Sequence, residues 1–187
     1  VKGNVRQIRQ AVDMIKEAKR PILYIGGGII ASHSERELLS VAESMQIPVV
    51  TTLMGKGAFP ASHPLNLGHV GMHGSKRQPY AKVIHVDVDP AEIGKNRMPQ
   101  IPIVGDAKVV LSGIEEQINA EHFEPITQEW LAQINEWREA HPFYSPGLAT
   151  PTGTISPEGA LDLLSDMLEQ DNSIVTTEVG QHQMWAA

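Results

Sequence analysis

Short apolar runs that alternate with amphipathic stretches limit the folds open to this chain of 187 residues. Runs at 22–25, 47–52, 82–90 and 101–104 have the length and apolar content of buried strands. Stretches whose apolar residues recur every three or four positions lie before the first run, between the first and second runs, and after the last. Strands that alternate with helices form parallel βαβ units, so we predict the α/β class with an open doubly wound parallel sheet.

The amphipathic stretches predict the helices of the same fold. Ser34, with Glu37 three residues later, fits a capping box, and Ser156 followed by Pro157 fits a capped helix start. The predicted helices cover residues up to 19, 34–45, 107–119 and 127–140, and a last one begins at 156.

A stretch rich in proline, glycine, serine and threonine divides the chain into two predicted domains. It covers 141–155 and has the composition of a linker. Residues 1–140 form the predicted sheet domain. Residues 156–187 form the start of a second α/β unit, with a strand expected over 173–177.

The formal net charge of −7 and the absence of cysteine exclude several classes of protein. An acidic chain lacks the basic surface that nucleic acids require. Without cysteine there is no disulfide scaffold, thiolate metal site or cysteine nucleophile. No apolar run approaches the roughly 18 residues of a membrane span. The chain starts without methionine or a signal-peptide pattern, so we expect a processed or internal start and a cytoplasmic location.

A glycine-rich turn follows the first predicted strand. Gly26, Gly28 and Ala31 have the spacing of a phosphate-binding turn, where glycines admit a ligand close to the backbone and a helix start offers N–H donors. An NAD site would need an acid at the end of the next strand, where Thr51 and Thr52 stand instead, which disfavours an NAD dehydrogenase. A tight connection without a ligand explains the turn equally well.

Residues 53–80 show no clear period, and so long a loop indicates either a function or a missing segment. The glycines within 68–74 would let the backbone approach a ligand. His69 and His73 are four positions apart, but the glycines disfavour a helix and no nearby carboxylate completes a metal site. We therefore interpret this segment as a ligand-contacting loop rather than a metal site.

Three aspartates lie at or just after the C-terminal ends of predicted strands, where ligands of parallel sheets bind. Asp87 could accept hydrogen bonds from a ribose or an adenine, whereas Asp89 before Pro90 fits a helix start. We interpret Asp87 as a contact and Asp89 as structural. Asp106, after Gly105, either holds the edge of a cofactor or caps the next helix, and the sequence leaves both open.

The segment from Glu178 to Trp185 passes from a predicted strand through Gly180 into a predicted helix start. Gln181 and His182 in its first turn could hold a diphosphate together with backbone N–H donors. The start of a core helix explains the same residues, and local physics does not separate the two interpretations.

Taken together and in this order, the motifs resemble the large, catalytic subunit of the acetolactate (acetohydroxyacid) synthase family, which depends on thiamine diphosphate. The resemblance covers nearly the whole chain, from the middle domain to the start of the C-terminal domain. The matching sequence segments are ILYIGGG at 22–28, TLMGKGAFP at 52–60, GMHG at 71–74, VIHVDVDPAEIGKNR at 83–97, PIVGD at 102–106 and TTEVGQHQMWAA at 176–187.

The resemblance implies a transferase that condenses two pyruvates, or pyruvate and 2-oxobutyrate, to a 2-aceto-2-hydroxy acid with loss of CO₂. This reaction belongs to the biosynthesis of the branched-chain amino acids valine and isoleucine. The implied cofactors are thiamine diphosphate, FAD in a flavoprotein middle domain, and Mg²⁺ (magnesium) whose ligands lie outside this chain. The implied partners are 2-oxo acids, further copies in a dimer or tetramer, and a regulatory small subunit, with no nucleic acid and no membrane.

The resemblance assigns cofactor contacts to this chain but no catalytic and no metal-ligating residue. The residues implied for FAD are Gly27, Thr52, Leu53, Val70, Gly71, Met72, His73, Asp87, Val88, Asp106 and Ala107. The residues implied for thiamine diphosphate are Val179, Gly180, Gln181 and His182 at the diphosphate, with Met184 nearby.

The chain departs from the family pattern in two ways. The family's activating glutamate and metal-binding segment have no counterpart here, so the resemblance implies that the isolated chain is inactive. About 30 residues that include a strand are absent near 75–80, and losing a strand from inside a sheet exposes two edges. Either the numbering covers the visible residues of a longer protein or the chain is truncated, and we favour the first.

Two other functions fit part of the sequence. Another thiamine-diphosphate enzyme, such as glyoxylate carboligase, pyruvate oxidase or a catabolic acetolactate synthase without FAD, would share the fold. A non-catalytic nucleotide-binding module would use 26–28 and Asp87 but leaves 176–187 unexplained.

Overall fold

The computed structural model describes residues 2–70, 81–121, 123–140, 153–168 and 173–181. Its contacts divide the chain into two compact units, Val1–Ala132 and Gln133–Ala187. The first unit contains every strand of the described residues, and the second contains most of α5 and all of α6.

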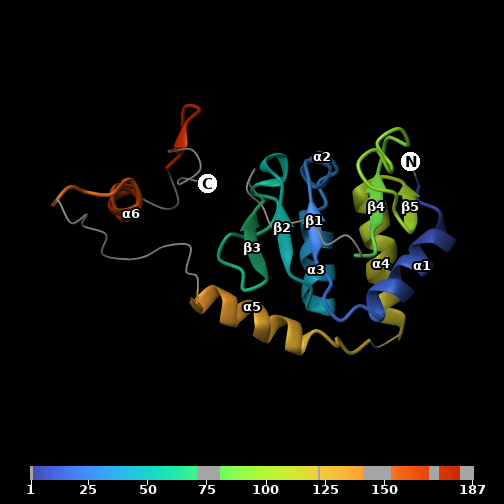
Figure 1. Cartoon of the computed structure of the whole chain (residues 1–187). Helices are drawn as coiled ribbons and strands as arrows, with labels where there is room; N and C mark the ends of the chain where they lie inside the picture. Colours follow the sequence, from blue (N-terminus) through green and yellow to red (C-terminus); the bar gives the residue numbers. More distant parts are fainter. Residues whose placement is uncertain (1, 71–80, 122, 141–152, 169–172, 182–187) are drawn as a thin grey trace. The chain divides into compact units, whose positions relative to one another are not determined.

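Parallel strands form two small sheets in the first unit (Figure 1). The three-stranded sheet has the order β1-β2-β3, and the second sheet pairs β4 with β5, all in parallel. Flanking helices complete an α/β fold, so the predicted fold class is confirmed. The strands are β1 (Leu23–Ile25), β2 (Val49–Thr51), β3 (Asn66–His69), β4 (Ile84–Asp87) and β5 (Ile101–Val104).

The helices follow the predicted amphipathic stretches to within a few residues. The turn after β1 adds the short helix α2, and the turn after β2 adds one turn of 3₁₀ helix, η1. The elements are α1 (Val5–Lys16), α2 (Gly28–Ala31), α3 (Glu35–Met45), η1 (Leu53–Gly55), α4 (Ala107–Glu121), α5 (Gln128–Ala140) and α6 (Pro157–Met167).

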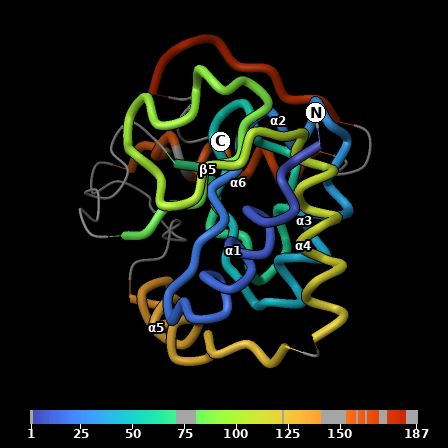
Figure 2. Tube along the Cα trace, turned by 90° about the vertical axis from the view of Figure 1, so that its right-hand side faces the viewer, coloured from blue at the N-terminus to red at the C-terminus, as the bar shows by residue number. Residues whose placement is uncertain are grey.

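One hydrophobic core joins the two sheets to α1, α3 and α4. Helix α4 contacts both α1 and α3, and it runs alongside α3 in Figure 2. On α3 the residues Leu38, Val41, Ala42 and Met45 recur every three or four positions, and each is 0–1% exposed. This spacing places them on one face of α3, which packs into the core. The neighbouring Ile103 of β5 is also fully buried.

Hydrogen bonds at the helix ends confirm the predicted start of α6 and contradict the predicted start of α3. The Ser156 side chain accepts a hydrogen bond from the Gly159 N–H at 3.0 Å, and Pro157 occupies the first turn of α6, as predicted. The predicted capping box at Ser34 is wrong, because its Oγ donates to the Ile29 carbonyl at 3.2 Å instead of accepting from α3. The hydroxyl completes the turn that follows α2.

Two predictions about strands are also wrong. The segment predicted as an irregular loop contains β3, whose Gly68 has a φ of +79° beside an irregular register with β2. Glycine takes this conformation without strain. Because it has no side chain, Gly68 also interrupts the alternation of apolar and polar residues that would have indicated a strand. The strand predicted over 173–177 does not form, and Ile174 is 92% exposed there. A strand needs a paired neighbour, and this segment has none among the described residues.

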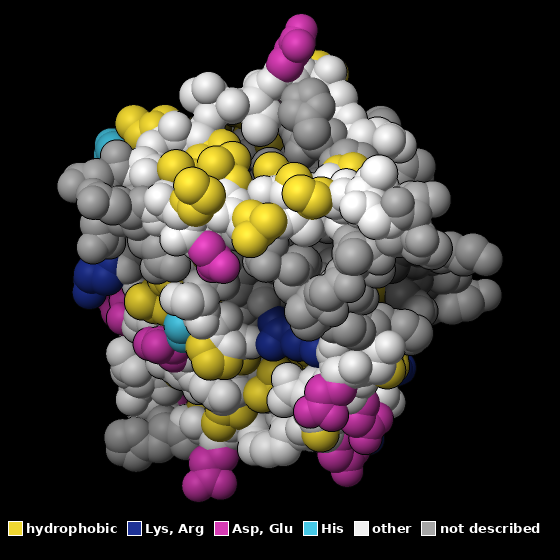
Figure 3. Space-filling model, turned by 90° about the vertical axis from the view of Figure 1, so that its left-hand side faces the viewer, with side chains coloured by type: hydrophobic (Ala, Val, Ile, Leu, Met, Phe, Trp, Pro, Cys, Tyr) yellow, Lys and Arg dark blue, Asp and Glu magenta, His cyan; other side chains and the backbone are white. Residues whose placement is uncertain are grey.

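The second unit exposes apolar side chains on α6. Leu163, Leu164 and Met167 are all exposed, although they lie on an amphipathic helix. Figure 3 shows that apolar side chains reach the surface on one face of the molecule. The predicted domain limits at 140 and 156 stay a prediction, since the first of the two units already ends within α5.

Replacing Met45 tests the core. Met45 is 1% exposed, and Met98 is 78% exposed. We expect Met45→Ala to lower the free energy of unfolding by about 2–5 kcal/mol, because it removes buried contacts and leaves a cavity. The matched control Met98→Ala should change it by less than about 0.5 kcal/mol. Chemical denaturation of both variants measures the difference, and equal effects would contradict the described core.

Candidate functional site

The carboxyl ends of the parallel strands carry most of the predicted ligand contacts. Glycines follow β1, Thr52 follows β2, Asp87 ends β4 and Asp106 follows β5. Lys108, two residues beyond Asp106, donates a hydrogen bond from Nζ to the His33 carbonyl at 3.1 Å. His33 follows α2, so this bond brings the carboxyl ends of β1 and β5 to the same side of the unit. Ligands of parallel α/β sheets bind at this edge.

Two turns interlock behind this edge. The Thr52 N–H donates to the Ile25 carbonyl at 2.8 Å, and the Thr52 Oγ1 accepts from the Gly55 N–H at 3.1 Å. A Cβ added to Gly55 would lie 2.8 Å from the Ile25 carbonyl oxygen, so only glycine fits there. A Cβ added to Gly27 would meet the Met54 side chain at 3.3 Å. The turn after β2 therefore holds the glycine turn after β1 in place.

Apolar side chains stand exposed at the same strand ends. Leu53 is 59% exposed and Met54 is 74% exposed, both in η1, while Val88 after β4 is 58% exposed. Gly28 has open space where a Cβ would stand. A flat ring system could cover these apolar groups, and the glycines would admit its linking phosphates close to the backbone.

The aspartates at the end of β4 and two residues beyond it, Asp87 and Asp89, each accept a hydrogen bond within a backbone turn. The Asp87 Oδ1 accepts a hydrogen bond from the Asp89 N–H at 2.9 Å, and the Asp89 Oδ1 accepts from the Ala91 N–H at 2.8 Å. Asp89 therefore has the structural role predicted for it, but in a turn rather than at a helix start. Asp87 is half-buried at the strand end, with Oδ1 engaged by the turn.

Asp106 caps α4. Its Oδ1 accepts hydrogen bonds from the backbone N–H groups of Lys108 and Val109, at 3.0 and 3.3 Å. The structure thus shows the capping role that the sequence left open beside a cofactor contact. Ala107 is the first residue of α4 and stands half-buried beside this cap.

A buried carboxylate stands close to the Lys108–His33 bond. The Glu37 side chain is 3% exposed, and its Oε1 lies 2.9 Å from Arg36 Nη2 and 3.9 Å from Lys108 Nζ. A hydrogen bond from its own backbone N–H, opposed by burial and aided by Arg36 and Lys108, lowers the pKa of Glu37 below the usual glutamate value. The charged carboxylate helps to hold Lys108 across the gap between α3 and α4.

The other predicted cofactor contacts lie partly in the first unit, partly in the second, and partly outside the described residues. Val70 follows β3, and its N–H donates to the Thr51 carbonyl at 2.9 Å, beside the turn at Thr52. In the second unit Val179 is 90% exposed, and Gly180 and Gln181 follow it. The predicted contacts that lie outside the described residues are Gly71, Met72, His73, His182 and Met184.

Sequence reasoning assigned no role at this edge to four residues that shape it, although it named Glu37 as part of a capping box. Met54 and Gly55 occur in the matching segment at 52–60, so the available signal was a glycine in the turn that follows β2. Glu37 and Lys108 lie 71 positions apart in the numbering and meet only through packing, so no local pattern reveals the pair.

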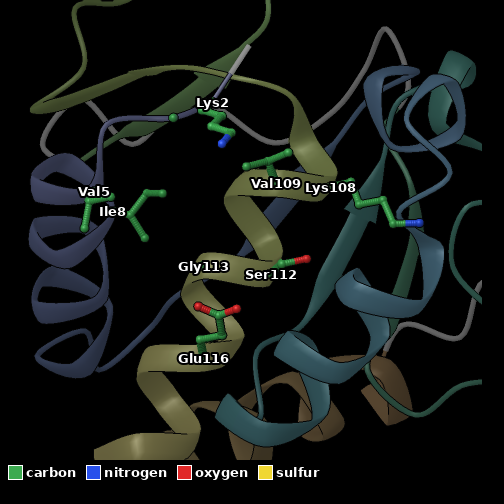
Figure 4. A pocket seen from close by; sticks show the side chains of 9 residues that line it. Lys2, Val5, Ile8, Lys108, Val109, Ser112, Gly113 and Glu116 are labelled. Atoms are coloured by element: carbon green, nitrogen blue, oxygen red, sulfur yellow. The ribbon is translucent and has the colours of Figure 1, made fainter.

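A separate groove lies between α1 and α4 (Figure 4). Its volume is about 350 Å³, and none of the predicted cofactor contacts lines it. Gly113 permits this close approach, since a Cβ there would lie 3.3 Å from the Ile8 Cδ1. Within the described part of the chain, no group of three or more His, Cys, Asp or Glu residues could hold a metal ion. Nor does any described helix have the length and apolar content needed to cross a membrane.

The chain matches a family model described as the central domain of thiamine pyrophosphate enzymes. The match falls in two parts, over residues 8–78 and 76–114.

Curated proteins with similar sequences carry the name acetolactate synthase large subunit. One from Mycobacterium tuberculosis is 38% identical over 218 aligned positions, which include 100% of this chain and 35% of that protein. Those of Cyanidium caldarium and Parasynechococcus marenigrum are each 37% identical and cover 98% and 96% of this chain, and 36% and 33% of their own lengths. The chain thus spans about a third of the length of these relatives.

Adding a methyl group at Gly55 tests the interlocked turns. We expect Gly55→Ala to lower the free energy of unfolding by about 1–3 kcal/mol, because the new Cβ would force the backbone at Ile25 to shift. Gly28→Ala is the matched control, since a Cβ there meets no atom within 4 Å. Thermal unfolding of both variants measures the effect, and an unaffected Gly55→Ala protein would refute the interlocking.

The lowered pKa of Glu37 predicts a pH dependence of stability. A carboxyl group whose pKa is lower in the folded than in the unfolded protein stabilises the fold above the ordinary glutamate pKa. That contribution disappears as the pH falls from about 4.5 through the folded pKa. We expect Glu37→Gln to lower the Tm at pH 7 and to approach the Tm of the wild type as the pH falls below the folded pKa of Glu37.

Glu35→Gln, in the same first turn of α3, is the matched control for the charge change. A difference in Tm between wild type and Glu37→Gln that does not shrink as the pH falls from 7 to the acid limit of the folded state would contradict the role of the charge.

Proposed function

Because the chain belongs to the thiamine pyrophosphate enzymes, whose central domain it contains, we propose that it is part of an acetolactate synthase large subunit. The complete protein would condense two pyruvates, or pyruvate and 2-oxobutyrate, with loss of CO₂. That reaction would serve the biosynthesis of valine and isoleucine. The relatives' names support the reaction, and the family model supports the use of thiamine diphosphate.

We assign the first unit to FAD binding. The observation that carries this assignment is the shared edge where glycine turns, exposed apolar side chains and strand-end aspartates stand together. The residues present fit a flavin dinucleotide, which combines a flat ring, a diphosphate and hydroxyl groups. Gly27 and Thr52 would face its phosphates and linking chain, while Leu53 and Val88 would cover apolar parts of its rings.

Polar groups at the edge would fix the position of the dinucleotide. Asp87 would accept hydrogen bonds from hydroxyl or amine groups through the carboxylate oxygen that its own turn does not use. Asp106 and Ala107 would present the start of α4, with Asp106 holding that start in place. Val70 and its neighbours Gly71, Met72 and His73 would complete the contacts from the end of β3.

The second unit would contribute to thiamine diphosphate binding. Val179, Gly180, Gln181 and His182 would meet its diphosphate, and Met184 would lie near the cofactor. When bound, thiamine diphosphate supplies the electron sink for decarboxylation, and the protein positions it and excludes water. Mg²⁺ would be held by residues of the complete protein beyond this chain, which also explains why we expect no turnover by the isolated chain.

Titration with FAD tests the first assignment. We expect Asp87→Ala to weaken FAD binding by about tenfold, which corresponds to about 1.4 kcal/mol. Asp13→Ala makes the same charge change on the exposed face of α1 and should leave the affinity unchanged. Quenching of flavin fluorescence measures both, with thermal unfolding to check the fold. Equal affinities for Asp87→Ala and wild type would remove Asp87 from the site.

The reaction itself is tested on the complete protein. Pyruvate supplied with thiamine diphosphate, Mg²⁺ and FAD should yield acetolactate, and omission of thiamine diphosphate should abolish the product. Parallel assays replace the second substrate. Acetyl phosphate from pyruvate, phosphate and O₂, or tartronate semialdehyde from two glyoxylates, formed in preference to acetolactate, would identify a pyruvate oxidase or glyoxylate carboligase type and overturn the proposed reaction.

A further inference from the structure

The proposed flavin contacts are divided between two sheets that no described ladder joins. Gly27 and Thr52 follow strands of the three-stranded sheet. Asp87 and Asp106 lie at or just after the ends of β4 and β5. One dinucleotide can reach both groups of contacts only if the two sheets keep a fixed separation at their carboxyl ends. The interactions that join the sheets at this edge therefore decide whether the site is formed in advance of binding.

The Lys108 side chain connects the segments that follow the two sheets at this edge. Lys108 lies in the first turn of α4, and its Nζ donates to the His33 carbonyl at 3.1 Å (Figure 4 shows this side chain on the side of α4 that faces away from α1). The Ala31 N–H donates to the Gly27 carbonyl at 2.9 Å. The His33 N–H donates to the Ile30 carbonyl at 3.1 Å, so a displacement of His33 would be transmitted to the glycine turn.

The backbone of His33 indicates that its position has to be held from outside. Its φ is +52°, in the left-handed region that few residues other than glycine adopt. Such a conformation persists only where the surrounding structure maintains it. The bond from Lys108 to the His33 carbonyl is one of these restraints.

A buried carboxylate keeps the Lys108 ammonium in this place. Glu37 Oε1 lies 3.9 Å from Lys108 Nζ, and the Glu37 side chain is 3% exposed. Burial reduces screening by water, so the attraction between the two charges exceeds that of an exposed pair. The Glu37 Oε2 is buried and has no hydrogen-bond partner among the described residues. Hydrogen bonding of both oxygens therefore does not explain why a carboxylate stands here, whereas its charge beside Lys108 does.

We propose that Glu37 and Lys108 are positioning residues of the flavin site. Glu37 holds the Lys108 ammonium on the His33 carbonyl, and this bond sets the distance between the glycine turn at 26–28 and the start of α4 at 106–107. One FAD molecule then contacts both groups without rearrangement of the edge. The inference rests on the proposed binding of FAD by the first unit.

A second bond between the same two helices provides a matched control. The Ser40 Oγ donates to the Glu115 Oε1 at 2.5 Å and so also joins α3 to α4. Both helices begin at the strand-end edge, and Ser40 and Glu115 lie further along them. Loss of this bond should weaken the packing of α3 against α4 without altering the edge.

Titration of the whole chain and its variants with FAD, followed by quenching of flavin fluorescence, tests the proposal. Lys108→Met removes the ammonium but keeps the backbone N–H that Asp106 caps, and we expect it to weaken FAD binding by about tenfold. Glu37→Gln should also weaken binding. The double variant should bind no more weakly than Lys108→Met, because Glu37 acts through Lys108. Lys108→Arg should restore most of the affinity that Lys108→Met loses, since a guanidinium carries the same charge and also donates to a carbonyl.

Two readouts separate positioning from a general effect on packing. Ser40→Ala should lower the Tm but leave the affinity for FAD unchanged. Without FAD, amide hydrogen exchange at Ala31, Ser32 and His33 should be faster in Lys108→Met than in the wild type, because their turn has lost a restraint. In Ser40→Ala it should equal that of the wild type.

Several results would overturn the proposal. These include equal affinities of Lys108→Met and wild type, equal loss of affinity in Ser40→Ala, and unchanged amide exchange in Lys108→Met. Tighter or unchanged binding by Glu37→Gln would show that Lys108 instead contacts the phosphates of FAD directly. A wild-type chain that binds no FAD would remove the proposed FAD site and this inference with it, whereas unchanged variants of a chain that binds FAD would overturn the inference alone.

Discussion

The parallel register between β1 and β2 is the constraint on which the candidate site depends. Leu23 pairs with Val49 and Ile25 with Thr51, so the two strands end at the same level. The turns that follow then interlock, with Gly55 directly against the Ile25 carbonyl. A slip of one residue would turn every side chain of the strand to the opposite face and separate these turns. The glycine turn, and any ligand contact it makes, is therefore fixed by strand pairing rather than by its own sequence.

Most of the fold could be predicted from local patterns, and the failures have physical causes. Periodicity located α1, α3 and α4, because their apolar residues recur on one face and that face is buried. Strand β3 was missed because it is short and polar and contains Gly68 at positive φ. The strand over 173–177 was expected from its composition alone, but a strand also needs a neighbour to pair with.

Those residues of the candidate site that lie at the end of a predicted strand could be predicted from that position alone. Thr52 and Asp87 lie at strand ends, and the parallel topology brings such ends to one edge. The sequence did not decide whether Asp106 caps α4 or contacts a cofactor. The structure shows that it caps α4. The pairing of Glu37 with Lys108 could not be predicted, because it depends on how α3 packs against α4. That packing also aligns the two sheets through the bond from Lys108 to His33.

The central claim is that the strand ends of the first unit bind a flavin dinucleotide, and NMR mapping of backbone amides during titration with FAD tests it most directly. The account predicts shifts confined to the glycine turn at 26–28, the turn at 52–55, residues 70–73 after β3, the end of β4 at 87–88 and the start of α4 at 106–107. Shifts centred on the groove between α1 and α4, or no shifts at saturating FAD, would contradict it.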